Sequence, residues 1–343
     1  QPGGSATVLR LFHSIFGATS ERGRYSGELV QAAIERAVAI TDARLSALSG
    51  YQKKLRPAVI RAIDHVVDLV DALPPPIDVA TAGYGADHRL IAFFASGEHM
   101  RQVINADRDL ADFAGNQAGA AEQIFALLLM EKREKTVFGM DLEGEVLKRD
   151  VAQVTVNFAG HRLVDPATQE SETRRLLKRR AFDHLLTLAL GRIVAAREER
   201  TDLQRQHVLL RNKLKSLESG HWSFEATHDD NAGDRVSLEA RVEEIETQLR
   251  AQVADTGTLN AHLATLIDVL ARAEEQLKAS RVNLIVDRMG IKRQQITDTA
   301  PELVLNELTS ADGRSLIMSL VSIPRGEYQP RRTLFSEGQR FLG

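Results

Sequence analysis

The 343-residue sequence contains no cysteine, which excludes disulfides, cysteine-ligated zinc, iron–sulfur clusters and thiolate nucleophiles. Aromatic residues make up only 5% of the chain, so we expect a core of aliphatic side chains. No apolar run approaches the ~20 residues that a membrane-spanning helix needs. The longest runs, 124–130 and 185–190, have the length of core segments. The composition therefore favours helices that pack through aliphatic seams.

The chain also lacks an excess of positive charge and the linear motifs of common enzymes. Its net charge is −3 and its pI is near 6.4, whereas a protein devoted to nucleic acid is usually more basic. It has no Walker A, Gly-x-Ser-x-Gly or His-Glu-x-x-His sequence, and Gly83-Tyr84-Gly85 lacks the third glycine of a dinucleotide site. We therefore predict no cofactor, no catalytic residues and no metal ligands, and we favour a protein that is not an enzyme.

The sequence predicts a location only weakly. Val8–Phe16 is too short for a signal peptide, so we expect a cytoplasmic protein. A periplasmic location is the alternative, because the chain starts at Gln1 and not at methionine. A weaker alternative is peripheral membrane attachment through a short apolar turn near the N-terminus. That turn holds Leu9, Leu11, Phe12, Ile15 and Phe16.

What the chain does have is a seven-residue repeat in two stretches. Apolar residues alternate at spacings of three and four over 186–217 and again over 238–277. A repeat of 3.5 residues makes a narrow seam that another helix must cover. The first seam holds Leu186, Ala189, Ile193, Ala196, Arg200, Leu203, His207, Leu210, Leu214 and Leu217. The second holds Leu238, Val242, Ile245, Leu249, Gln252, Thr256, Leu259, Leu263, Leu266, Leu270, Ala273 and Leu277. We predict one antiparallel coiled-coil hairpin, the arm, which closes on itself through a polar loop.

The helices of this arm have predicted ends. The outgoing helix should run from about Thr168 to Glu218, with acidic residues near its start. The returning helix should begin near Arg235 and continue to about Asp287, with a soft spot at Gly257. Because it is longer than its partner, its last part needs another neighbour. The helical stretch 26–73, whose apolar face runs from Val30 to Leu69, is the candidate.

Both ends of the arm are flanked by segments with the two-residue period of strands. The first hairpin should span 135–158, after a helix at about 118–134, and the second should span 303–323 across Asp312-Gly313. A helical hairpin returns to its origin, so the two β-hairpins should share one small sheet of about four strands. The predicted fold class is therefore mainly α with a small antiparallel β component (α+β), a helical base carrying a long antiparallel coiled-coil arm.

This gives a predicted organisation in five parts. They are a flexible segment over 1–25, a helical base with the first β-hairpin over 26–185, the arm over 186–277 with its tip loop at 219–234, the return to the base with the second β-hairpin over 278–330, and a tail over 331–343.

The tip loop carries the leading functional prediction. Exposed aromatic side chains at the end of a long arm suit a docking contact. The tip residues are His221, Trp222, Phe224 and His228. We predict a non-enzymatic scaffold or adaptor whose arm, or its tip, binds another protein. Self-association into a homo-oligomer is an alternative for the same arm.

Two further hypotheses come from other residues. A basic ridge of Arg174, Arg175, Lys178, Arg179 and Arg180 could contact nucleic acid, although no aromatic side chains interleave it and pairing with Glu170, Glu172 and Asp183 is the simpler interpretation. A metal-assisted enzyme could use polar residues in 83–99 and 161–165. These are Asp87, His88, Glu98, His99, His161 and Asp165. We favour neither over the scaffold.

Overall fold

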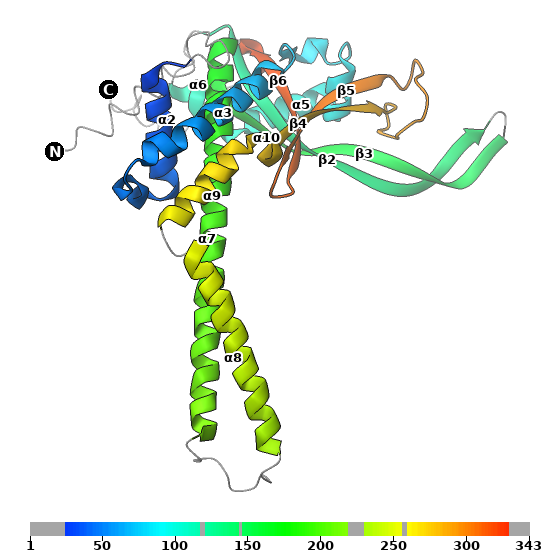
Figure 1. Ribbon diagram of the computed structural model, residues 1–343. Coiled ribbons are helices and arrows are strands. Elements are labelled where there is room, and N and C mark those ends of the chain that lie inside the picture. The colour runs from blue at the N-terminus through cyan, green and yellow to red at the C-terminus, as the bar shows by residue number, and fades with distance from the viewer. Residues whose placement is uncertain (1–24, 117–120, 144–145, 219–229, 256–258, 329–343) are drawn as a thin grey trace, which may run out of the picture. The chain divides into compact units, whose positions relative to one another are not determined.

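The computed structural model describes residues 25–116, 121–143, 146–218, 230–255 and 259–328 (Figure 1). These residues form a mixed α+β protein, which confirms the coarse fold class. They divide into two compact units, each made from separate stretches of the chain. The helical unit comprises the described residues of Ser20–Ile63 and Phe182–Ala273, and the sheet unit comprises those of Asp64–Ala181 and Glu274–Gly343. The boundaries fall inside three helices, after Ile63, after Ala181 and after Ala273.

The helical unit begins with α2 (Gly27–Thr41), a short 3-10 helix η1 (Ala43–Ala47) and the first part of α3 (Tyr51–Asp71). Ser26 caps α2, because its side chain accepts a hydrogen bond from the Leu29 amide at 3.2 Å. One face of α2 is buried. It consists of Leu29, Val30, Ala32, Ala33, Ile34, Ala37, Val38 and Thr41. The single apolar face predicted for this stretch is therefore present, divided among three helical segments.

The same unit contains most of α7 (Glu170–Glu218), together with α8 (Asp230–Asp255) and α9 (Leu259–Ala271). The predicted end of the outgoing helix at Glu218 is confirmed. The returning stretch is helical from residue 230, five residues earlier than expected. The expected soft spot at Gly257 and most of the tip loop lie outside the described residues. The N-terminal helices do contact α9, since Arg61 of α3 donates a hydrogen bond to the Ala271 carbonyl at 3.3 Å.

The sheet unit is built on six strands, and Figure 1 shows them with the short helices beside them. The strands are β1 (Ile77–Asp78), β2 (Gln123–Glu143), β3 (Val146–Ala167), β4 (Leu277–Ile285), β5 (Glu302–Ser310) and β6 (Ser315–Pro324). Their order is β3-β2-β6-β5-β4, all antiparallel, and β1 adds to β6 in parallel. The two predicted hairpins, β2–β3 and β5–β6, thus share one sheet, as expected.

The first hairpin is longer than predicted, and the expected helix at 118–134 is wrong from Gln123 onward. Ile124, Ala126 and Leu128 are buried on one side of β2, and Leu127 and Leu129 are buried on the other. A strand buried on both faces gives a continuous apolar run, which has no two-residue period and resembles a buried helix. Beyond Met130, β2 pairs with β3 alone, and there the alternation identified the strand correctly.

The returning helix also ends earlier than predicted. A short helix α10 (Ala273–Gln276) leads directly into β4, so the expected helix to Asp287 is wrong over its last eleven residues. The heptad pattern misled because Ala273 and Leu277 are both buried, which keeps the seam phase after the helix has stopped. Between β5 and β6 the predicted turn is confirmed, with Gly313 at a φ of 83°.

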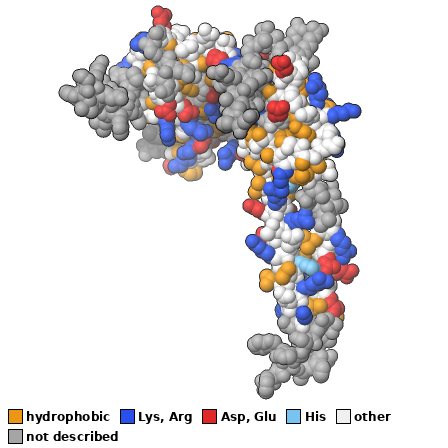
Figure 2. Space-filling view, turned by 90° about the vertical axis from the view of Figure 1, so that its left-hand side faces the viewer, with side chains coloured by type: hydrophobic (Ala, Val, Ile, Leu, Met, Phe, Trp, Pro, Cys, Tyr) orange, Lys and Arg blue, Asp and Glu red, His pale blue; other side chains and the backbone are white. Residues whose placement is uncertain are grey.

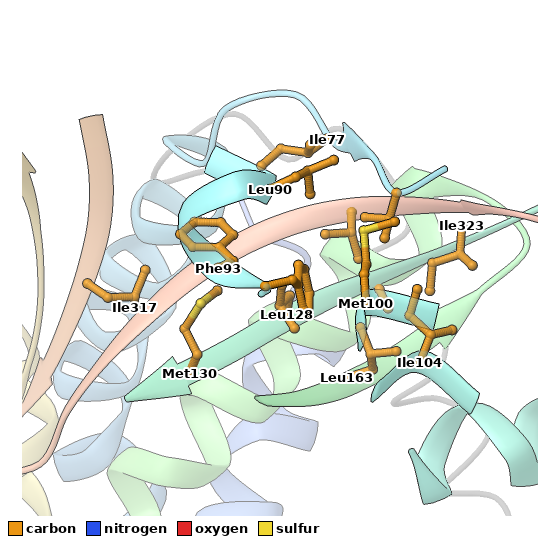
Figure 3. Packing of buried hydrophobic residues seen from close by; sticks show 14 of the residues in the cluster. Ile77, Leu90, Phe93, Met100, Ile104, Leu128, Met130, Leu163, Ile317 and Ile323 are labelled. Atoms are coloured by element: carbon orange, nitrogen blue, oxygen red, sulfur yellow. The ribbon is translucent and has the colours of Figure 1, made fainter. Parts of the chain in front are cut away.

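Three short helices, α4 (His88–Phe93), α5 (Gly97–Ala106) and α6 (Arg108–Asn116), supply the second layer of the sheet unit. Ser96 caps α5, because its side chain accepts a hydrogen bond from the His99 amide at 3.0 Å. Figure 3 shows the core that these helices complete with the strands. Its labelled residues are Ile77, Leu90, Phe93, Met100, Ile104, Leu128, Met130, Leu163, Ile317 and Ile323. Two short 3-10 helices, η2 (Thr81–Gly83) and η3 (Arg325–Glu327), lie at its margin.

Candidate functional site

Along α7 the burial follows the predicted heptad positions. Seven residues between Gly191 and Lys215 are buried or half-buried, at alternating spacings of three and four, and every other position in this range is exposed. They are Ile193, Ala196, Arg200, Leu203, His207, Leu210 and Leu214. A helix covered by one neighbour along a narrow stripe shows this pattern.

On α8 the covered residues also match the predicted seam. Leu238, Val242, Ile245 and Leu249 are buried or half-buried, and Glu246 beside them is half-buried. The two helices lie side by side, because the Nε2 atom of His207 is 2.9 Å from the Oε1 atom of Glu246 (Figure 1). The hydrogen bond from His207 lowers the pKa of the Glu246 carboxyl, and Arg250 on the next turn contributes in the same direction. A polar group at a seam position is thus paired across the seam.

The side of α7 opposite its seam is exposed and carries both apolar and charged residues. The exposed fractions are 39% for Val194, 56% for Val208 and 69% for Leu209. Figure 2 shows Lys and Arg side chains, Asp and Glu side chains, and apolar side chains interspersed along the described part of these helices. Single exposed apolar residues are ordinary, but Val208 and Leu209 are adjacent and large.

The predicted basic ridge is largely engaged within the sheet unit. Arg174 donates hydrogen bonds to the carbonyls of Val70, Leu73 and Pro74, at 2.8, 3.1 and 3.3 Å, and pairs with Glu170. These carbonyls lie at the end of α3, where helical carbonyls lack intrahelical partners. Arg174 therefore closes the end of α3 and is not available as a free surface cation.

Three other ridge residues have similar local contacts. Arg175 pairs with Glu172, and Lys178 lies 2.7 Å from Asp71. The side chains of Arg175 and Lys178 are only 17% and 15% exposed. Arg180, which is 53% exposed, pairs with Asp165 at 2.6 Å. The pairing of the ridge with Glu170 and Glu172 agrees with the simpler interpretation, so the geometry gives the nucleic-acid hypothesis little support.

The polar residues of 83–99 and 161–165 come together only in part. The rings of His99 and His161 lie 6.2 Å apart, and the His161 ring stacks on Phe94 at 4.9 Å. Asp87, by contrast, pairs with Arg89 at 2.6 Å and caps α4. Within the described residues no group of three or more His, Asp or Glu side chains could hold a metal ion.

His161 itself has a structural environment. Its Nε2–H donates to the Phe93 carbonyl at 2.8 Å. Burial lowers the pKa of the His161 imidazole, the bond to Phe93 opposes this shift, and the nearby His99 adds to it. His161 also lines an open groove of about 480 Å³ between α6 and β3, with Arg108, Arg162 and Arg180 beside it. Since Asp107 and Asp109 line the same groove, its charges nearly balance.

The sequence reasoning missed a buried charged cluster in the helical unit. Asp42, which is 8% exposed, accepts hydrogen bonds from Arg44 and, at 2.8 Å, from Arg197 of α7. The Nδ1 atom of His262 on α9 lies 2.9 Å from the same carboxylate. Arg44 holds the pKa of the Asp42 carboxyl far below its ordinary value, against the effect of burial, and His262 adds to the lowering. Asp42 also caps η1, because its side chain accepts a hydrogen bond from the Arg44 amide at 3.2 Å.

The tip residues His221, Trp222, Phe224 and His228 lie outside the described part of the chain, as do Leu9, Leu11, Phe12, Ile15 and Phe16. Among the helices that are described, none has the length and hydrophobicity required to cross a bilayer. Both the docking tip and the membrane contact therefore stay predictions from the sequence.

Comparison with known proteins gives no assignment for either unit. The chain matches no protein-family model, no curated protein and no solved structure.

Proposed function

We propose that this protein is a non-enzymatic scaffold or adaptor in which α7 and α8 form an antiparallel coiled-coil arm that binds another protein. One observation carries the proposal: from Gly191 to Lys215, only the seam positions of α7 are covered. The other positions of the helix in this range are exposed, and they include the apolar residues Val208 and Leu209.

The physical argument is that the seam and the outer side serve different purposes. Burying the seam residues holds the two helices together, so the outer side contributes little to folding. A leucine and a valine left in water on that side gain free energy only when a partner covers them, about 1.5–3 kcal/mol for each fully buried side chain. Paired helices also present such side chains with little loss of backbone entropy on binding. The tip residues predicted from the sequence would add a second contact.

A charge placed on the outer side tests the proposal. The full-length Val208→Asp/Leu209→Asp variant should lose captured partner proteins at least tenfold, because each carboxylate must be desolvated in the interface. The measurement is quantitative affinity purification from cells that express the tagged protein. The matched control is Met289→Asp, which changes an 81% exposed residue in the sheet unit and should leave capture unchanged.

Circular dichroism of both variants must match that of the native protein, since the residues changed are exposed. Equal capture of every partner by the native protein and by the arm variant would contradict the proposal for this side of the arm.

A further inference from the structure

The outer side of α7 has a charge and apolar pattern that is symmetric about one point. Seven exposed residues, spaced by three, four or one, lie opposite the seam, and we call them the α7 outer face. They are Val194, Glu198, Thr201, Asp202, Arg205, Val208 and Leu209. The midpoint between Thr201 and Asp202 leaves three of them on one side and four on the other, and the exposed Ala195 is the counterpart of Val208. Glu198 and Arg205 are equally far from this midpoint, with opposite charge, and Val194 and Leu209 are equally far, both apolar.

From this pattern we propose that the α7 outer face binds the same face of a second copy of the chain, antiparallel, about a two-fold axis between Thr201 and Asp202. The inference rests on the proposed function and names its partner. In a two-fold interface, residue i of one copy meets residue j of the other, and j meets i. Glu198 then meets Arg205 of the second copy, and Val194 meets Leu209, and each contact occurs twice.

Charge complementarity selects this arrangement over others. A parallel pairing in register would place Glu198 against Glu198 and Arg205 against Arg205, which is unfavourable. Within the described residues Glu198 has no ion pair, and Arg205 has only Asp202 on its own helix, at 3.3 Å. Since these two side chains are 74% and 66% exposed, that pair is weak and leaves Arg205 able to bind across the interface.

The outer face is open beyond its charged centre. Thr187 and Gly191 toward the start of α7 and Asn212 toward its end are exposed on the same side. A Cβ atom at Gly191 would meet no atom within 4 Å, so another helix can approach there. The stretch 191–212 is about 33 Å long at 1.5 Å per residue. One helix face of this length buries less than the ~800 Å² per partner of a standard interface, so the dimer should be weak and concentration-dependent.

Charge reversal in sedimentation velocity experiments tests the inference on the full-length protein. The native protein should form dimers as its concentration rises, and less so at high salt, because exposed ion pairs are screened. Glu198→Arg alone, and Arg205→Glu alone, should each weaken the dimer at least tenfold, since each creates like-charge contacts twice. The double variant Glu198→Arg/Arg205→Glu should restore the native dimer. The matched control is Arg241→Glu on α8, at a residue that is 56% exposed. It should leave the strength of the dimer unchanged.

A protein that stays monomeric at all concentrations would overturn the inference, and so would a dimer unaffected by either single reversal. A double variant as weak as the single variants would overturn it as well. If the monomeric protein still captures a different protein through Val208 and Leu209, the self-pairing fails while the proposed function stands.

Discussion

At the residue scale, the Asp42 carboxylate gathers partners from three parts of the helical unit. Its carboxylate receives hydrogen bonds from Arg44 on its own segment and from Arg197 on α7, and lies against His262 on α9. One buried side chain therefore links three elements that are far apart in the sequence. The partners bind the charged form of the carboxylate, which is why its pKa lies far below the ordinary value.

Replacing this carboxylate should destabilise the helical unit in a pH-dependent way. Asp42→Asn should lower the free energy of unfolding at pH 7 by about 2 kcal/mol, because the buried His262 and the Arg197 guanidinium, which is 45% exposed, lose their charged acceptor. A group whose pKa is depressed on folding stabilises above its unfolded pKa, and this contribution is lost as the pH falls through the folded pKa. The native protein should therefore begin to lose its advantage over the variant below about pH 4, and the advantage should shrink further as the pH falls toward the lower folded pKa. Urea unfolding at pH 7 and at lower pH measures both effects.

The control for this substitution is Asp202→Asn, which changes a 66% exposed carboxylate on α7. It should lower the free energy of unfolding only slightly. Equal stability of Asp42→Asn and the native protein at pH 7 would show that the cluster does not hold these elements together. A constant difference across the whole pH range would show that charge is not its basis.

At the element scale, the heptad seam was predictable because its signal is local. Whether Leu210 is covered and Leu209 is exposed depends on the period of one helix and on the helix beside it, and both lie in adjacent sequence. The same holds for the hairpin β5–β6, where Asp312-Gly313 fixes the turn.

Elements whose environment comes from distant sequence were not predictable. β2 resembles a helix because β3 and β6 flank it and both of its faces are covered, which the run Ile124–Met130 cannot show by itself. The role of Arg174 depends on carbonyls about a hundred residues away, at the end of α3. A cluster of basic residues on one helix therefore suggested a bound ligand, whereas the partners of these residues are groups of the same chain.

Two adjacent leucines on α7 test the seam directly. Leu210→Ala should lower the free energy of unfolding of the α7–α8 pair by about 1–2 kcal/mol, because a half-buried apolar side chain is removed from the seam. Leu209→Ala changes the neighbouring residue, which is 69% exposed, and should leave stability unchanged within about 0.5 kcal/mol. Hydrogen exchange of the α7 and α8 amides measures the local effect of each. Equal effects of the two substitutions would contradict the assignment of the seam.

At the scale of the whole molecule, the chain combines two compact units that share two long helices. The sheet unit has a closed apolar core between its sheet and α4, α5 and α6. The helical unit has a core around α2. It also contains α8 and the part of α7 beyond Gly191, which are buried along one seam only. The symmetric outer face is part of the α7 surface that folding leaves exposed. The proposed function thus depends on the α7 outer face, whose residues are not fixed by packing in the core.

Because the native chain has no cysteine, one introduced thiol reports on this surface alone. Thr201→Cys places a thiol beside the proposed two-fold axis, where it lies next to the introduced thiol of a second copy. Under mild oxidation the full-length variant should form a disulfide-linked species of twice 37.9 kDa, seen on a non-reducing gel, whereas Met289→Cys, at an 81% exposed site of the sheet unit, should stay monomeric. A Thr201→Cys protein that stays monomeric, or that cross-links no faster than the Met289→Cys control, would contradict the pairing of α7 outer faces.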